Sequence, residues 1–82
     1  SPIPLAYTKT PDGKILKLVN SRVCDTDFKG QAGEVVSLDG AIFIKCGTGT
    51  VIIDMVVPEG KGRMKATDYI NGRKIKLGDI LG

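Results

Sequence analysis

The sequence predicts an all-β fold, a small Greek-key barrel of five or six strands with one short helix. Eleven glycines are spread through the 82 residues, and Val/Ile-rich segments lie between them, as in proteins built from short strands and turns. Hydrophobic residues make up 41% of the chain and charged residues 26%, which is the ordinary range for a globular protein. A chain of this length has core enough for one compact unit. We therefore expect residues 1–82 to form a single domain.

The first part of the chain is expected to contain an extended lead-in, a turn and a strand. Pro2 and Pro4 keep the backbone out of the helical region, so residues 1–8 are predicted to be an extended lead-in, the end of an interdomain linker. Pro11-Asp12-Gly13 has the composition of a tight turn, because proline fixes φ and glycine accepts a positive φ. The apolar residues that follow predict a first strand over residues 14–24.

Three further strands are predicted to follow one another as a β-meander. Asp39-Gly40 between two apolar runs is a strong hairpin signal, and a second turn is expected at residues 47–49. The three strands are expected at residues 34–38, 41–46 and 50–57. Since side chains alternate between the two faces of a strand, their core face is predicted to comprise Ile42, Ile44, Cys46, Val51, Ile53 and Met55.

One helix and a closing strand are predicted for the last part of the chain. Residues 66–71 can form about one and a half helical turns before Gly72, which is expected to take the positive φ common directly after helices. Residues 74–80 are then predicted to form the final strand.

The composition argues against a self-contained enzyme. The chain has no histidine, the side chain that most often performs acid–base chemistry near neutral pH, and it has no nucleophile-elbow or phosphate-loop motif. Cys24 and Cys46 are expected to be reduced, buried thiols, because a small domain held together by disulfides usually carries four or more cysteines. Two cysteines without histidine or a CxxC spacing do not make a zinc site. The apolar runs are too short to span a membrane. We therefore predict no catalytic, cofactor-binding or metal-binding residue in this chain.

Positive charge is concentrated towards the C-terminal end. Residues 1–60 hold six basic and seven acidic side chains, whereas residues 61–82 hold six basic and two acidic ones, a net charge of +4. Three of these basic residues fall at every second position, which in an extended segment places them on one face. Such a surface suits a phosphate backbone, and a solvated polar face is the alternative. With two tyrosines and two phenylalanines, the chain offers few rings for base stacking, so backbone contact is expected. The candidate binding residues are Lys61, Arg63, Lys65, Arg73, Lys74 and Lys76.

Seven short motifs cover nearly the whole chain. They read PIPLAYT, DGKILKL, GEVV, CGTG, GKGRM, ATDYING and LGDILG, in that order from Pro2 to Gly82. In this order and spacing they resemble the motifs of the C-terminal domain family of formyltransferases, as found in enzymes that formylate methionyl-tRNA: NPxPGAxT, DGKxLKI, GxV, CGxG, GKKRM, AxDFLxG and GDxLG. The chain departs from this pattern at Leu5, where glycine is usual, at Gly62, where lysine is usual, and at Tyr69, where phenylalanine is usual.

The resemblance implies an open barrel similar to an oligonucleotide-binding barrel and an accessory role in translation initiation. This domain would hold the backbone of initiator tRNA for an N-terminal Rossmann-like catalytic domain. The family's catalytic Asn, His and Asp belong to that other domain, as does 10-formyltetrahydrofolate, so no cofactor is implied here. The parent enzyme would formylate methionyl-tRNA in the cytoplasm of a bacterium or in an organelle.

The same residues allow other interpretations, which are a related enzyme, an interaction module, or a packing role for single side chains. Related formyltransferases and formyl-folate hydrolases, which act on a sugar nucleotide or another amine without tRNA, carry similar C-terminal domains. A free-standing β-barrel interaction module is a further alternative. Cys46 is expected to be a packed residue rather than a nucleophile, and Met64 and Tyr69 are expected to contact the core rather than tRNA.

Overall fold

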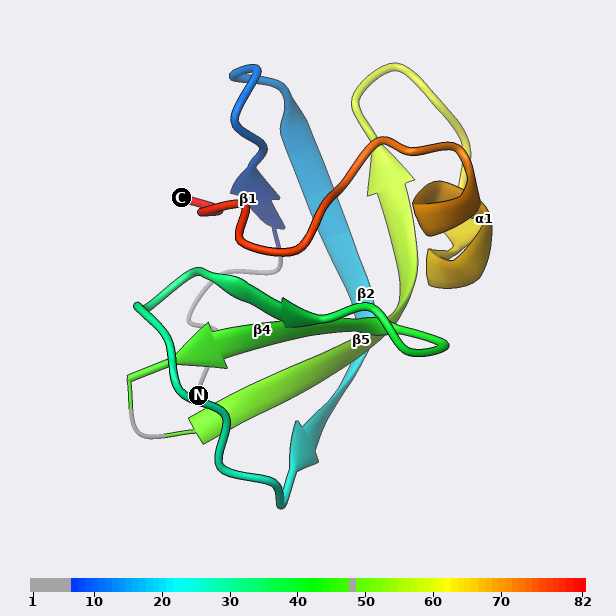
Figure 1. Cartoon of the computed structure of the whole chain (residues 1–82). Helices are drawn as coiled ribbons and strands as arrows, with labels where there is room; N and C mark the ends of the chain where they lie inside the picture. Colours follow the sequence, from blue (N-terminus) through cyan, green and yellow to red (C-terminus); the bar gives the residue numbers. More distant parts are fainter. Residues whose placement is uncertain (1–6, 48) are drawn as a thin grey trace.

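The protein is an antiparallel β-structure whose sheet curls into an open barrel (Figure 1). A computed structural model describes residues 7–47 and 49–82. Its elements are β1 (Tyr7–Lys9), β2 (Ile15–Cys24), β3 (Val35–Ser37), β4 (Ile42–Cys46), β5 (Gly49–Pro58), β6 (Met64–Lys65) and α1 (Ala66–Asn71). The strand order in the sheet is β1-β2-β5-β4-β3, and β6 also pairs with β5. The predictions for residues 1–6 and for the turn residue Thr48 lie outside the described residues.

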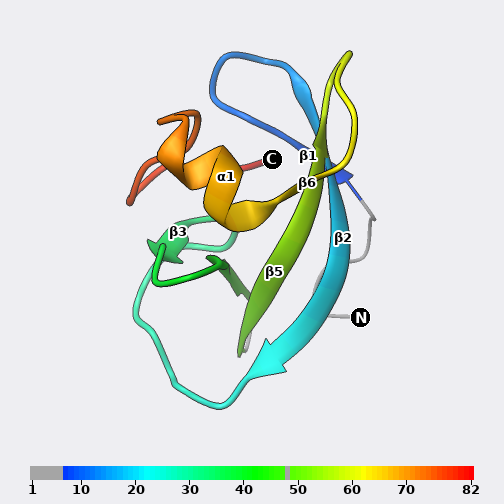
Figure 2. The same ribbon diagram turned by 90° about the vertical axis from the view of Figure 1, so that its right-hand side faces the viewer.

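The connections between the strands confirm the predicted fold class. β3, β4 and β5 form the meander, and β2, joined to β3 by a long loop, pairs with β5 on its other side. Three consecutive strands with a fourth beside the far end of the meander make a Greek key. The helix α1 has the predicted bounds of residues 66–71 and packs against β4, β5 and β6 (Figure 2). No helix among the described residues is long and apolar enough to cross a membrane.

The N-terminal lead-in is partly a strand, which the sequence did not predict. β1 pairs with β2 so that Tyr7 lies opposite Lys17. The predicted turn between them is present, because the Thr10 N–H donates to the carbonyl of Lys14 at 2.9 Å and the Gly13 N–H to the carbonyl of Thr10 at 2.8 Å. A three-residue strand close to two prolines carries too little pattern to be recognised, and its pairing partner defines it.

The predicted final strand over residues 74–80 is wrong. Within it, the Asp79 side chain accepts a hydrogen bond from the Lys76 N–H at 3.0 Å, and Gly78 has a φ of 87°. These features bend the chain into a turn instead of an extended ladder. The segment still connects the two edges of the open barrel, because the Val35 N–H donates to the carbonyl of Asp79 at 2.8 Å and the Gly82 N–H to the carbonyl of Lys9 at 3.0 Å. The C-terminal segment thus lies across the gap between the sheet edges β3 and β1 (Figure 1).

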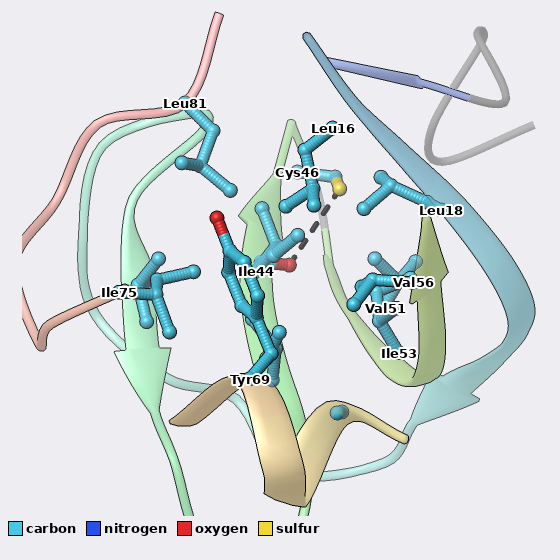
Figure 3. Close-up of a cluster of buried hydrophobic side chains, with 13 residues drawn as sticks. Leu16, Leu18, Ile44, Cys46, Val51, Ile53, Val56, Tyr69, Ile75 and Leu81 are labelled. Carbon is cyan, nitrogen blue, oxygen red and sulfur yellow. Dashed lines mark hydrogen bonds between the residues drawn. The ribbon is translucent and has the colours of Figure 1, made fainter. Parts of the chain in front are cut away.

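The core lies inside the curled sheet beneath α1 (Figure 3). Five of the six predicted core-face residues on β4 and β5 are buried, which confirms the register of this hairpin. The sixth, Met55, is only half-buried, and Val56 is fully buried in its place. The core cluster comprises Leu16, Leu18, Val35, Ile42, Ile44, Cys46, Val51, Ile53, Val56, Ala66, Tyr69, Ile75 and Leu81.

The change of inward face along β5 coincides with a kink in its partner strand. The pairing of β2 with β5 runs to Val19 opposite Met55 and resumes at Ser21 opposite Ile53. Between them Asn20 has a φ of 55°, in the left-handed region that ordinary strand residues avoid. A period of two predicts faces correctly only along an unbroken strand, so the prediction for Met55 was wrong at this point.

One buried hydroxyl weakens the core, and we expect its removal to stabilise the protein. Thr50 is 1% exposed and, among the described residues, its Oγ1 has no hydrogen-bond partner. Thr50→Val should therefore raise the free energy of unfolding by about 1 kcal/mol, because an unsatisfied buried polar group is removed at similar volume. Thr10→Val is the matched control: its hydroxyl bonds Asp12 and the carbonyl of Lys14, so this change should destabilise. Urea denaturation of both variants measures the difference, and equal shifts of the same sign would contradict it.

Candidate functional site

The six candidate basic residues lie along the segment that leads from β5 through β6 and α1 to the C-terminal turn. All six side chains are exposed. Lys61 lies in the turn after β5, where its N–H donates to the carbonyl of Pro58 at 3.0 Å. Lys65 ends β6 and directly precedes α1, and Lys76 lies in the turn closed by Asp79.

The expected alternation of three basic residues on one strand face is not present. Only Met64–Lys65 is a strand there, and Lys61 belongs to a turn. The sequence pattern assumed an extended backbone, whereas Gly60, with a φ of 74°, turns the chain. Placement of these side chains therefore follows from the turn and the helix rather than from strand periodicity.

The end of α1 determines where the second basic group lies. The Gly72 N–H donates to the carbonyl of Asp68 at 3.0 Å and the Arg73 N–H to that of Ile70 at 2.9 Å. Gly72 was expected to take a positive φ but has −75°, and Arg73 takes the left-handed conformation with a φ of 57°. The chain leaves the helix at this residue and continues through Lys74.

None of the six basic side chains has an ion-pair partner among the described residues. The ion pairs among the described residues join Arg22 to Asp54 at 2.9 Å and Lys45 to Asp27 at 3.3 Å. Both involve basic residues from the first sixty positions, where acidic residues outnumber basic ones. The carboxylate of Asp54 raises the pKa of Arg22, and the guanidinium lowers the pKa of Asp54. The excess positive charge after residue 60 is thus left free for an external anion.

Two of the six residues meet at a pocket with a third lysine that the charge count overlooked. Lys61, Lys74 and Lys14 line a pocket of about 230 Å³, whereas Arg63, Lys65, Arg73 and Lys76 do not. Lys14 follows the turn between β1 and β2, far from the other two in sequence. Charge counting could not single out Lys14, because it belongs to residues 1–60, where acidic side chains outnumber basic ones. The DGK of the second motif was the one sequence feature that included it.

Acidic residues also line this pocket. The Asp12 carboxylate accepts hydrogen bonds from the Thr10 hydroxyl and from the Lys14 N–H, and these bonds lower the pKa of Asp12. Glu59 accepts from the Ile15 N–H at 2.9 Å. Both carboxylates are therefore held by the backbone of the β1–β2 connection.

The aromatic rings are mostly engaged within the protein. Tyr69 is 7% exposed and points into the core (Figure 3), as the sequence predicted. Phe28 and Phe43 pack against each other with ring centroids 5.8 Å apart. Of the two tyrosines, Tyr7 has the more exposed ring, at 51%. Among the aromatic residues of the described part of the chain, Tyr7 alone is therefore exposed.

Burial of Tyr69 predicts a loss of stability at high pH. Desolvation, with the charges of Asp12 and Asp79, raises the pKa of Tyr69 above its ordinary value. The stability that this shift contributes is complete below about pH 10 and is lost as the pH rises through the folded-state pKa. Tyr69→Phe should therefore gain stability relative to the unchanged chain between pH 8 and pH 11, as measured by urea denaturation. Tyr7→Phe is the control, and an equal gain there would contradict the assignment.

The structure offers no metal centre in the part of the chain that it describes. No group of three or more His, Cys, Asp or Glu side chains comes close enough to hold a metal ion. Both cysteines are free; Cys46 is buried and Cys24 is half-buried rather than buried. Burial raises the pKa of the Cys46 thiol, which agrees with its expected packing role.

Comparison with known proteins assigns this chain to a family. The family model described as "Formyl transferase, C-terminal domain" matches residues 1–74. Methionyl-tRNA formyltransferase of Jannaschia sp. is 43% identical over 81 residues, which cover 99% of this chain and 25% of that protein. The enzymes of the same name from Citrifermentans bemidjiense and Alkaliphilus metalliredigens are 39% and 34% identical and are covered over 25% and 26% of their lengths. The chain thus spans about a quarter of these relatives, and it belongs to the formyltransferase C-terminal domain family.

Proposed function

We propose that this chain is the tRNA-holding domain of a methionyl-tRNA formyltransferase and that it contacts the tRNA backbone. The names of its relatives support the parent activity. The observation that carries the binding role is the set of six exposed basic side chains after residue 60 without ion-pair partners among the described residues. Because an ion pair would already satisfy such a charge, unpaired cations gathered in one segment suit a polyanion.

The catalytic steps belong, in this proposal, to an N-terminal Rossmann-like domain. That domain would bind 10-formyltetrahydrofolate and transfer its formyl group to the amine of methionyl-tRNA. The present domain would supply affinity and orientation, because phosphate contacts fix the position of a nucleic acid without reading its sequence. We place the parent enzyme in the cytoplasm of a bacterium or in an organelle.

Single-charge variants test the binding role. Arg63→Gln should lower the slope of log affinity against log salt concentration by about one unit, because one phosphate contact is lost. The loss should be similar for several different tRNAs, since backbone contacts carry no base information. Fluorescence anisotropy of the chain with labelled tRNAs between about 25 and 200 mM salt measures both quantities.

Lys29→Gln is the matched control, because Lys29 is exposed and lies in the loop between β2 and β3, outside residues 61–76, the basic segment that holds the six candidate residues. It removes the same charge and should leave the slope nearly unchanged. If Arg63→Gln and Lys29→Gln weaken binding alike, the basic segment is an ordinary solvated surface. A tRNA-independent formyltransferase then becomes the better interpretation.

A further inference from the structure

The pocket beside α1 has the build of a small-ligand site. It lies between the connection from β1 to β2, the turn after β5, and the helix, so three segments that are separate in sequence enclose it. Its volume of about 230 Å³ is below the roughly 300–1,000 Å³ of sites for drug-sized molecules, so it suits one small group such as a base. Half-buried Pro58 and Met64 and buried Tyr69 supply an apolar floor.

Three exposed lysines stand around this floor. Lys14, Lys61 and Lys74 have no ion-pair partner among the described residues, although three carboxylates line the same pocket. Since ammonium groups are long-range point charges on flexible stems, they can converge on one phosphate at the rim. The pocket therefore carries three positive charges that no carboxylate among the described residues pairs with.

The three carboxylates differ in what they can still bind. Asp12 and Glu59 already accept hydrogen bonds from the backbone N–H groups of Lys14 and Ile15. Asp68, exposed on α1, has no side-chain hydrogen bond to another described residue. A carboxylate without such bonds can accept hydrogen bonds from the N–H groups of a ligand, and two neighbouring N–H groups on one edge of a planar ligand satisfy both of its oxygens.

We infer that this pocket binds a single unpaired nucleotide, with the phosphate at the three lysines, the base on the apolar floor and an N–H edge of the base at Asp68. A ligand with both an anion and donor groups matches the mixture of charges, whereas an inorganic anion would leave Asp68 without a partner and close to a second negative charge. Guanine presents two adjacent donors on its Watson–Crick edge, so a guanine nucleotide should bind best. The nucleotide can be part of an RNA or free in solution, and the inference does not depend on the proposed tRNA contacts.

Titration of the ¹⁵N-labelled chain with mononucleotides tests this inference. GMP should shift the amide resonances of Gly13, Glu59 and Gly72 saturably, and it should bind more tightly than AMP, UMP or ribose 5-phosphate. Asp68→Asn, a nearly isosteric change, should weaken GMP about fivefold and remove its advantage, because one bidentate pair is lost. Lys74→Ala should weaken all four ligands by a similar factor, and Lys29→Ala, outside the pocket, should weaken none.

A single-stranded RNA of five nucleotides with one guanine distinguishes the two sources. If it binds more tightly than GMP while shifting the same amides, the nucleotide belongs to RNA; if GMP binds more tightly, the pocket serves a free nucleotide. Either result supports the site. Ribose 5-phosphate binding as tightly as GMP, shifts confined to other residues, or an unchanged GMP affinity in Asp68→Asn would overturn it. Failure here is separate from failure of tRNA binding, because Asp68 reports on the pocket alone and Arg63 on the basic segment alone.

Discussion

Gly33→Ala is expected to destabilise the protein by about 2–5 kcal/mol. A Cβ atom at residue 33 would overlap with the carbonyl oxygen of Leu81, and the residue has a φ of 86°. The left-handed conformation costs an ordinary residue about 1–2 kcal/mol, and overpacking adds about 1–3 kcal/mol. The backbone cannot move aside freely, because the Gly33 N–H donates to the carbonyl of Lys45 at 2.7 Å and the Leu81 N–H donates to the carbonyl of Gly33 at 2.8 Å.

Gly40→Ala separates the close contact from the backbone strain. Gly40 has a similar φ of 72°, but a Cβ atom there would meet nothing within 4 Å. This variant should lose only the strain energy of about 1–2 kcal/mol. Urea denaturation gives both free energies of unfolding. Equal losses in the two variants would show that the close contact between Gly33 and the C-terminal segment does not contribute to stability.

The meander and the helix could be predicted because their signals are local. Asp39-Gly40 marks the hairpin, and the alternation from Ile42 to Cys46 marks its core face. The bounds of α1 follow from a short helical pattern that ends before Gly72. Each of these signals lies within a few residues of the structure that it specifies.

The missed elements depend on contacts between distant segments. β1 is a strand because the turn at residues 10–14 brings it against β2. The last residues join the edge of the open barrel through hydrogen bonds to Gly33 and Val35 without forming a strand of their own. A local pattern carries no information on such contacts. A strand was therefore predicted at residues 74–80, where none forms, and β1 was not predicted.

In the candidate site, too, the residues with a local sequence signal could be predicted and those brought together by the fold could not. The basic residues after position 60 could be found by counting charges, since all of them lie in one segment. Lys14 could not, because only the fold brings the β1–β2 connection beside Lys61 and Lys74. The face of Lys61 was mispredicted, because the turn at Gly60 interrupts the assumed strand.

Removing three charges from the basic segment is expected to abolish most tRNA binding by the chain. Arg63, Lys65 and Lys76 are exposed, have no ion-pair partner among the described residues and do not line the pocket. If three or four such residues contact phosphates, the affinity of the unchanged chain should fall about a hundredfold between 50 and 200 mM salt. The triple glutamine variant should lower the salt slope by about two to three units, because each lost contact removes about one.

A second triple variant provides a control with the same net charge. Lys9, Lys17 and Lys29 are also exposed, have no ion-pair partner in the described part of the chain and lie outside the basic segment. Changing either set of three to glutamine lowers the formal net charge from +3 to 0. The two variants therefore have the same net charge and differ in where the charge is removed.

The most direct test of the account is the salt dependence of tRNA affinity for these two triple variants, measured side by side. We predict that the variant at Arg63, Lys65 and Lys76 loses most of the affinity and most of the salt slope, while the variant at Lys9, Lys17 and Lys29 keeps both close to those of the unchanged chain. Equal losses in the two variants would contradict the account, because tRNA would then respond to the total charge of the chain and not to the basic segment.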